Sequence, residues 1–269
     1  MSNIDLRIGD CLEVMKTLPN EYIDLTITSP PYDNLRTYNG YSFDFENVAK
    51  ELFRITKNGG VVVWVVGDKV ENGSKTLTSY KQSLFFKEIG FNVYDIIIYE
   101  KTSPSAPHKN RYFNSFEYMF IFSKGKPKTI NLLEDRKNKY ANSKTGTITK
   151  REKDGTLTKK ESKTIQEYGI RTNIWSYAVG NNKSTTDKKA YQHPAIFPEK
   201  LVEDHLLSWS NEGDTILDCF MGSGTTGKMC KLLNRNFIGI EIDKKYFEIA
   251  KERIDKARSI KQTTIDNYI

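Results

Sequence analysis

The feature that most constrains the fold is an unbroken apolar run, Val61–Val66, which follows two glycines. A strand with one face in water alternates apolar and polar residues, so a run without alternation predicts a strand that is covered on both faces. Six further runs have strand character: Ile4–Ile8, Tyr22–Thr28, Phe91–Tyr99, Phe116–Ser123, Thr215–Phe220 and Asn236–Glu241. The chain is therefore expected to build a central sheet of seven strands.

Segments with helical periodicity lie between several of these strands. They are Cys11–Leu18, Phe45–Thr56, Ser79–Ile89, Pro198–Ser208, Thr225–Leu233 and Lys244–Ala257. Strands that alternate with helices of this length are typical of an α/β domain with a parallel sheet. A length of 269 residues suits one large domain, or one domain that carries an inserted module.

The composition changes in the middle of the chain. Residues 124–190 are rich in Lys, Thr, Asn, Ser and Gly, and the stretch 147–155 has the pattern of a polar hairpin. A disordered linker has a similar composition. An ordered binding module is favoured here because four aromatic residues interleave with the basic ones: Tyr140, Tyr168, Trp175 and Tyr177. We therefore expect three parts, namely 1–123, a basic loop-rich insert at 124–190, and 191–269.

Charge and cysteine content bound the partners and the compartment. The formal net charge of +7 fits a polyanionic partner such as nucleic acid, although a solvated lysine surface explains it equally well. The three cysteines, Cys11, Cys219 and Cys230, form neither a disulfide framework nor a zinc-ligand spacing. We expect a reducing, cytoplasmic compartment and no metal. No signal-peptide pattern or membrane-spanning apolar run is present in the sequence, so we expect no membrane association.

One motif, Asp218–Thr226, places an acid at a strand end, then a glycine turn, then a helix. Gly222 and Gly224 would let the backbone approach a nucleotide-type ligand closely. The next strand ends in Glu241, where an acid can accept both hydrogen bonds from a ribose diol. This arrangement predicts a site for a nucleoside-containing cofactor.

The same stretch also resembles a phosphate-binding loop. Gly222–Lys228 has the spacing G-x-x-x-x-G-K, but Met229 stands where Ser or Thr must hold magnesium. The carboxylate of Asp218 would also repel a triphosphate. A nucleoside triphosphatase is therefore the weaker interpretation.

A second motif, Thr28-Ser29-Pro30-Pro31-Tyr32, follows an apolar stretch near the N-terminus. The two motifs together resemble those of the amino-methylating DNA methyltransferases. Asp-Cys-Phe-Met-Gly-Ser-Gly-Thr-Thr is similar to the family's D-x-F-x-G-S-G-T signature, whose loop holds S-adenosylmethionine. Ser-Pro-Pro-Tyr is similar to its (D/N/S)-P-P-(Y/F/W) motif.

The order of the motifs, with the catalytic one first, resembles the β class of this family. The resemblance covers about 1–125 and 190–258. It implies an α/β fold with a circularly permuted, Rossmann-like, seven-stranded methyltransferase sheet, in which Ile4–Ile8 lies beside the strand that ends in Glu241. The insert at 124–190 would be the target-recognition region.

The resemblance also implies the catalytic residues, which are Ser29, Pro30, Pro31 and Tyr32. An exocyclic amine on a nucleobase is a poor nucleophile, because its lone pair is delocalised into the ring. Ser29 Oγ and the Pro30 carbonyl can accept its two hydrogens, and proline fixes φ, so that this carbonyl is held in place. Tyr32 would stack on the flipped base, which is worth roughly 1–3 kcal/mol.

The cofactor residues come from five segments. Asp10 and Cys11 resemble the family's G-D-x-L opening, in which the acid lies near the cofactor's adenine amine; a helix N-cap explains Asp10 equally well. The stretch His193–Lys200 resembles H-P-x-x-(F/Y)-P-x-x-L, which encloses the methionine end. The full predicted set is Asp10, Cys11, Thr28, Phe197, Pro198, Lys200, Asp218, Phe220, Gly222, Ser223, Gly224, Thr225, Thr226 and Glu241.

Contacts to DNA are predicted at four basic residues: Arg36, Lys101, Lys109 and Arg111. Ordinary surface charge explains each of them equally well. The stretch from Arg111 to Phe122 resembles a late family strand, H/N-x-x-E-x-(I/L)-x-x-F. In that comparison Asn114, Ser115 and Glu117 would help to shape the base pocket.

Serine in the first position of the catalytic motif resembles the cytosine-N4 enzymes more than the adenine-N6 enzymes, which usually carry Asp or Asn. The expected function is therefore methylation of cytosine N4 in double-stranded DNA, as part of a restriction-modification system. Adenine N6, an RNA or protein amine, and an inactive nucleic-acid-binding module are the alternatives. The resemblance also suggests a cognate restriction endonuclease and a second copy of the chain as partners.

Overall fold

The computed structural model describes residues 2–31, 44–103, 110–146, 148–160, 162–180, 183–193 and 196–257. The chain divides into two compact units. The main unit comprises Met1–Asn131 and Asn173–Ile269, and the small unit comprises Leu132–Thr172. The small unit lies within the expected insert, but the end of that insert belongs to the main unit.

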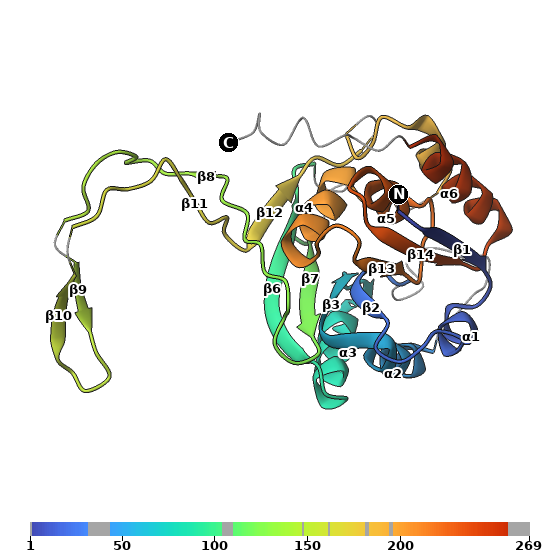
Figure 1. Ribbon diagram of the computed structural model, residues 1–269, viewed down its shortest axis with the longest axis horizontal. Coiled ribbons are helices and arrows are strands. Elements are labelled where there is room, and N and C mark those ends of the chain that lie inside the picture. The colour runs from blue at the N-terminus through green and yellow to red at the C-terminus, as the bar shows by residue number, and fades with distance from the viewer. Residues whose placement is uncertain are drawn as a thin grey trace. The chain divides into compact units, whose positions relative to one another are not determined.

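The main unit is built on an eight-stranded sheet (Figure 1). Its strands in spatial order are β1 (Ile4–Ile8), β14 (Asn236–Glu241), β13 (Thr215–Asp218), β2 (Ile23–Thr28), β3 (Thr56–Val66), β7 (Phe116–Ser123), β6 (Asn92–Lys101) and β12 (Ile174–Tyr177). All seven expected strands are present. The strand β1 pairs in parallel with β14, as the family resemblance implies.

The sheet is parallel, as the alternation of strands and helices predicts, except at one strand. The strand β7 runs antiparallel to both of its neighbours, β3 and β6. A parallel connection needs a long crossover, usually through a helix, whereas antiparallel strands do not. The described residues between β6 and β7 contain no helix, which is consistent with an antiparallel connection.

The eighth strand, β12, was not expected, because it arises from the predicted insert. It pairs in parallel with β6 at the edge of the sheet. Its residues alternate between exposed and buried, and Trp175 and Tyr177 face the protein. Trp175 packs on the ring of His205, and the Tyr177 hydroxyl donates to Asp204 Oδ2 at 2.8 Å. These two aromatic residues therefore fix the end of the insert to the main unit.

Helices cover both faces of the sheet (Figure 1). One group comprises α1 (Cys11–Lys16), α2 (Phe45–Ile55) and α3 (Thr78–Glu88), and the other comprises α4 (Glu199–Trp209), α5 (Thr225–Leu232) and α6 (Lys244–Lys256). Each expected helix is present, with its ends shifted by one or two residues at most. None of the described helices is long and apolar enough to cross a membrane.

The apolar run in β3 explains why the sheet needs two helical layers. Val62, Trp64 and Val66 belong to a core cluster that also contains Leu52 of α2 and Phe86 of α3. The alternate residues of the strand point to the opposite face. Those residues, Val61, Val63 and Val65, are buried as well. A strand buried on both faces is what the unbroken run predicts.

The small unit consists of two-stranded ribbons in its described residues. The strands β9 (Ile148–Arg151) and β10 (Leu157–Lys160) form an antiparallel hairpin, which confirms the predicted polar hairpin. The strands β8 (Arg136–Lys137) and β11 (Tyr168–Gly169) pair in the same way. In the main unit, β4 (Val70–Glu71) and β5 (Ser74–Lys75) form a short hairpin after β3, and η1 (Lys188–Gln192) is a 3₁₀-helix.

Candidate active site

The two sequence motifs begin side by side at one edge of the sheet. The strands β2 and β13 are parallel neighbours, with Leu25 opposite Ile216. Their last residues are joined by a hydrogen bond, in which Thr28 Oγ1 donates to Asp218 Oδ1 at 2.8 Å. Ser29 follows one strand and the glycine loop, residues 219–224, follows the other. Two segments that are 190 residues apart in the sequence therefore start from one buried contact.

This edge has the topology of a ligand site. The helix α2, which follows β2, lies on one face of the sheet, and α5, which follows β13, lies on the other (Figure 1). In α/β sheets, ligands bind outside the carboxyl ends of the strands where successive connections diverge in this way.

Asp218 is the anchor of the edge. It is almost fully buried, and its Oδ2 accepts a hydrogen bond from Thr226 Oγ1 at 2.7 Å. Its Oδ1 accepts from the amide of Phe220 at 3.2 Å, in addition to Thr28. Burial raises the pKa of Asp218 to about 6, and the hydrogen bonds from Thr226, Thr28 and Phe220 oppose that increase. The carboxylate holds the strand ends and the first turn of α5 together.

Two glycines of the loop have left-handed backbone conformations, with φ of 53° at Gly222 and 76° at Gly224. A Cβ atom on Gly224 would lie 2.7 Å from the Cβ of Ala250, so this glycine lets α6 pack against the loop. A Cβ atom on Gly222 would lie 3.0 Å from the ring of His193. The sequence predicted a close approach of a ligand here; the described neighbours are other parts of the chain.

Glu241 ends β14 at the same edge and is held by two backbone amides. Its Oε2 accepts from the amide of Gly222 at 2.8 Å, and its Oε1 accepts from the amide of Asp243 at 2.9 Å. Burial raises the pKa of the Glu241 carboxyl. A carboxylate oxygen has two lone pairs, so each oxygen retains capacity for a further donor, such as a ribose hydroxyl.

Asp10 lies beside Glu241, because the amide of Gly9 donates to the Glu241 carbonyl at 2.9 Å. Its Oδ1 accepts from the amides of Leu12 and Glu13, so the predicted N-cap of α1 is confirmed. Cys11 is buried, and burial raises the pKa of its thiol to about 12.

The remaining predicted cofactor residues lie at the start of α4. Pro198 is buried at the N-cap position, and Phe197 before it is half-buried. The Lys200 ammonium forms ion pairs with Glu203 at 2.9 Å and with Asp204 at 3.0 Å. The described partners of Lys200 are thus acids of its own helix.

The catalytic segment is described up to Pro31. Ser29 and Pro31 are half-buried, and Pro30 is buried. Tyr32, together with the predicted DNA contacts Arg36 and Lys109, lies outside the described residues.

The other two predicted DNA contacts lie at or after the end of β6. Lys101 is ion-paired with Glu117, and its ammonium lies 5.6 Å from the centre of the Tyr99 ring. Arg111 is exposed and donates to the carbonyl of Gly73.

A cavity of about 170 Å³ lies where β3 ends and β7 begins, one strand away from the catalytic segment. Its walls combine aromatic and polar side chains: Asp68, Lys75, Leu77, Tyr80, Asn114, Phe116, Glu117 and Tyr118, with Gly67. The hydroxyls of Tyr80 and Tyr118 lie 2.7 Å apart, and Asp68 accepts two hydrogen bonds from Ser79.

Sequence reasoning selected Asn114 and Glu117 but missed the rest of this cavity. Asp68 carries a detectable signal, because it is an acid just beyond a buried strand, as Asp218 is. Nothing in the sequence marks Tyr80 and Tyr118, because they are 38 residues apart and come into contact only when the chain folds.

Comparison with known proteins agrees with this geometry. A family model described as DNA methylase, of the N6 and N4 type, matches residues 23–252. The orphan methyltransferase M.BamHII of Bacillus amyloliquefaciens is 60% identical over 251 residues, which cover 92% of this chain and 91% of that protein.

Solved structures share the fold. The PvuII DNA methyltransferase (cytosine-N4-specific) matches with a TM-score of 0.69 at 20% identity, covering 99% of this chain and 90% of the other. The M1.HpyAVI–SAM complex matches with a TM-score of 0.60 at 26% identity, covering 93% and 99%. With a family match over most of its length and a fold shared with solved methyltransferases, the chain belongs to the DNA methylase family.

Proposed function

We propose that this protein transfers a methyl group from S-adenosylmethionine to the N4 amine of a cytosine that is flipped out of double-stranded DNA. The observation that carries the proposal is the buried hydrogen bond between Thr28 and Asp218, 2.8 Å long. It supports a shared site for a methyl acceptor beside Ser29 and a methyl donor beside the glycine loop.

The residues at the edge fit a nucleoside cofactor. Glu241 has a fixed carboxylate for the ribose diol, and Asp10 lies next to it for the adenine amine. Phe197 and Pro198 would enclose the methionine end. When bound, S-adenosylmethionine supplies an electrophilic methyl on a sulfonium. The M1.HpyAVI structure at 26% identity was solved with this ligand, which supports the same assignment here.

The catalytic segment would orient the amine rather than deprotonate it. Ser29 Oγ accepts one hydrogen of the amine and the Pro30 carbonyl accepts the other, which directs the lone pair outward. The burial of Pro30 and its fixed φ hold that carbonyl in place. Ser29 is no base at neutral pH, so the proton goes to solvent after transfer. The buried thiols Cys219 and Cys230 have raised pKa values, and the direct reaction needs no thiolate.

A base inside a duplex must leave the stack to reach this segment, at a cost of a few kcal/mol. The cavity at the end of β3 and the start of β7 has the composition that suits a nucleobase. The rings of Tyr80 and Tyr118 offer flat faces, and Asn114 and Asp68 offer polar groups for a base edge. Stacking on Tyr32 would add to these contacts.

Arg111 is our candidate phosphate contact, because it is exposed near this cavity. Lys101 would first have to leave Glu117. Arg36 and Lys109 stay predictions, as do a cognate endonuclease, a homodimer, a cytoplasmic location and a target-recognition role for 124–190.

The choice of base rests on Ser29. The test is to methylate DNA with the purified protein, digest it to nucleosides and identify the product by mass spectrometry. N4-methyl-2′-deoxycytidine is expected, and the Ser29→Ala variant is the control for background. N6-methyladenine nucleoside alone would overturn the choice of base and leave the mechanism intact. If the protein neither binds S-adenosylmethionine nor labels DNA, it is an inactive binding module.

A further inference from the structure

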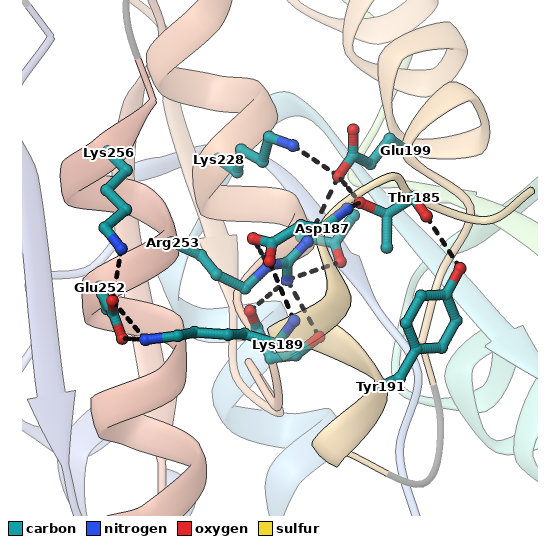
Figure 2. Close-up of polar contacts among 11 residues, drawn as sticks. Thr185, Asp187, Lys189, Tyr191, Glu199, Lys228, Glu252, Arg253 and Lys256 are labelled. Carbon is teal, nitrogen blue, oxygen red and sulfur yellow. Dashed lines mark hydrogen bonds and ion pairs between the residues drawn. The ribbon is translucent and has the colours of Figure 1, made fainter. Parts of the chain in front are cut away.

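One arginine of α6 is buried although that helix lies at the surface. The side chain of Arg253 is only 1% exposed. Its guanidinium donates to the carbonyl of Ser223 in the glycine loop, to Ser223 Oγ at 3.1 Å and to Thr225 Oγ1 at 3.3 Å. It also pairs with Asp187 at 3.0 Å and with Glu199 at 3.3 Å (Figure 2). A single cation thus joins three separate segments of the chain.

The segment that carries Asp187 is residues 183–193, here called the strap. It leads from the end of the insert towards Phe197 and Pro198, which are predicted to enclose the methionine end of the cofactor. The strap follows α6, because Lys189 pairs with Glu252 (Figure 2). In addition, the ring of His193 packs edge-on against Tyr246, with 4.4 Å between the ring centres. Exposed ion pairs such as Lys189–Glu252 contribute little. The contact of Arg253 with Asp187 is partly buried and joins the strap to the inner face of α6.

Glu199 extends the network to α5. It accepts hydrogen bonds from Thr185 of the strap and from Lys228, whose ammonium lies 2.7 Å from Glu199 Oε1 (Figure 2). Lys228 is the lysine of the sequence that resembles a phosphate-binding loop. Its described partner is a carboxylate, which a phosphate-binding lysine would not have.

We propose that Arg253 is a positioning residue for the cofactor site. Arginine offers five donors in a rigid fork, so it can hold several acceptors in one fixed geometry, which lysine cannot do. The glycine loop has two left-handed residues, and glycine restricts its own backbone less than any other residue. By holding the loop beside the strap and Glu199, Arg253 would preorganise the glycine loop and the start of α4, the two parts that we assign to S-adenosylmethionine. This inference rests on the proposed function.

The test compares Arg253→Met, Arg253→Lys and the wild type in the full chain. The control is Lys256→Met on the same helix, because Lys256 is exposed and pairs with Glu252. The readouts are the Kd for S-adenosylmethionine by calorimetry, the KM for DNA, kcat at saturating cofactor, and Tm.

We expect Arg253→Met to raise the Kd for the cofactor by about tenfold or more and Arg253→Lys by a smaller factor, because both lose the fixed geometry of the loop. The KM for DNA, and kcat at saturating cofactor, should change by less than about threefold, since Arg253 is not assigned to the base. Lys256→Met should stay within about twofold of the wild type throughout.

A lower Tm with an unchanged Kd of the folded protein would assign Arg253 to stability alone and overturn the proposal. If Arg253→Met fails to fold, Asp187→Asn decides, because it removes one charge from the strap and keeps the volume. It should weaken cofactor binding, and an unchanged Kd again overturns the proposal. Failure of the wild type to bind S-adenosylmethionine would instead refute the proposed function.

Discussion

Replacing Thr28 by valine tests the contact on which the site depends. The change removes the hydroxyl that donates to Asp218 at 2.8 Å and keeps the branched shape of the side chain. Thr28 and Asp218 are 0% and 2% exposed, so water cannot replace the lost donor. A buried hydrogen bond to a charged group contributes about 1.5–3 kcal/mol. We expect a loss of about 2 kcal/mol in the free energy of unfolding at pH 8, or about a 30-fold change in the folding equilibrium.

Thr26 provides a matched control on the same strand. It is also 0% exposed, and its hydroxyl finds no hydrogen-bond partner among the residues that the structure describes. Removing an unpaired buried hydroxyl costs little or stabilises a fold, so Thr26→Val should be neutral or more stable by up to about 1 kcal/mol.

The assay is urea denaturation of both variants, followed by tryptophan fluorescence. The reasoning is refuted if the two variants differ by less than about 0.5 kcal/mol, the range of an ordinary neutral substitution. Repeating the measurement at pH 5 tests whether the cost depends on the negative charge of Asp218. Since the pKa of Asp218 is about 6, its carboxyl is mostly protonated there, and the cost of Thr28→Val should fall to about 1 kcal/mol.

Three further predictions concern the same edge. Ser29→Ala should lower kcat by about 100-fold without changing the Kd for S-adenosylmethionine, as methylation assays and calorimetry can check. Glu241→Gln should raise that Kd about tenfold, because an amide cannot accept from both Gly222 and Asp243 as the carboxylate does; unchanged calorimetry would refute the role. Because the pKa of Asp218 is raised to about 6 in the folded state, its protonated carboxyl stabilises the fold below about pH 4. This stabilisation is lost as the pH rises through about 6. Relative to Asp218→Asn, the wild type should therefore lose about 2.4 kcal/mol of unfolding free energy between pH 4 and pH 7; equal pH profiles in urea would contradict this.

Local physics made much of the fold predictable. The run Val61–Val66 identified a strand buried on both faces, and Asp10 marked the start of α1 by its capping role. These features depend on neighbours within a few residues. The pairing of β1 with β14 came instead from the family resemblance, since no local pattern encodes which strands become neighbours.

The features that were missed depend on contacts between distant segments. The strand β12 joins the sheet because Trp175 and Tyr177 find His205 and Asp204 on α4, which a polar sequence context conceals. Arg253 stands in a run of charged residues, although Ile249, Ala250 and Ile254 mark the buried face of α6 beside it. The burial of Arg253 could have been predicted from this spacing, because helical periodicity places position 253 on the same face as these apolar residues.

The way the small unit is attached bears on how target choice could change during evolution. The chain leaves the main unit at Asn131, which bonds to the Ser208 and Leu207 carbonyls of α4, and returns at Asn173, which bonds to β6. Each boundary residue is thus pinned to the main unit by its own hydrogen bonds. If the small unit recognises the target, as we propose, a cassette bounded in this way can be exchanged between relatives at two fixed joints while the main unit stays constant.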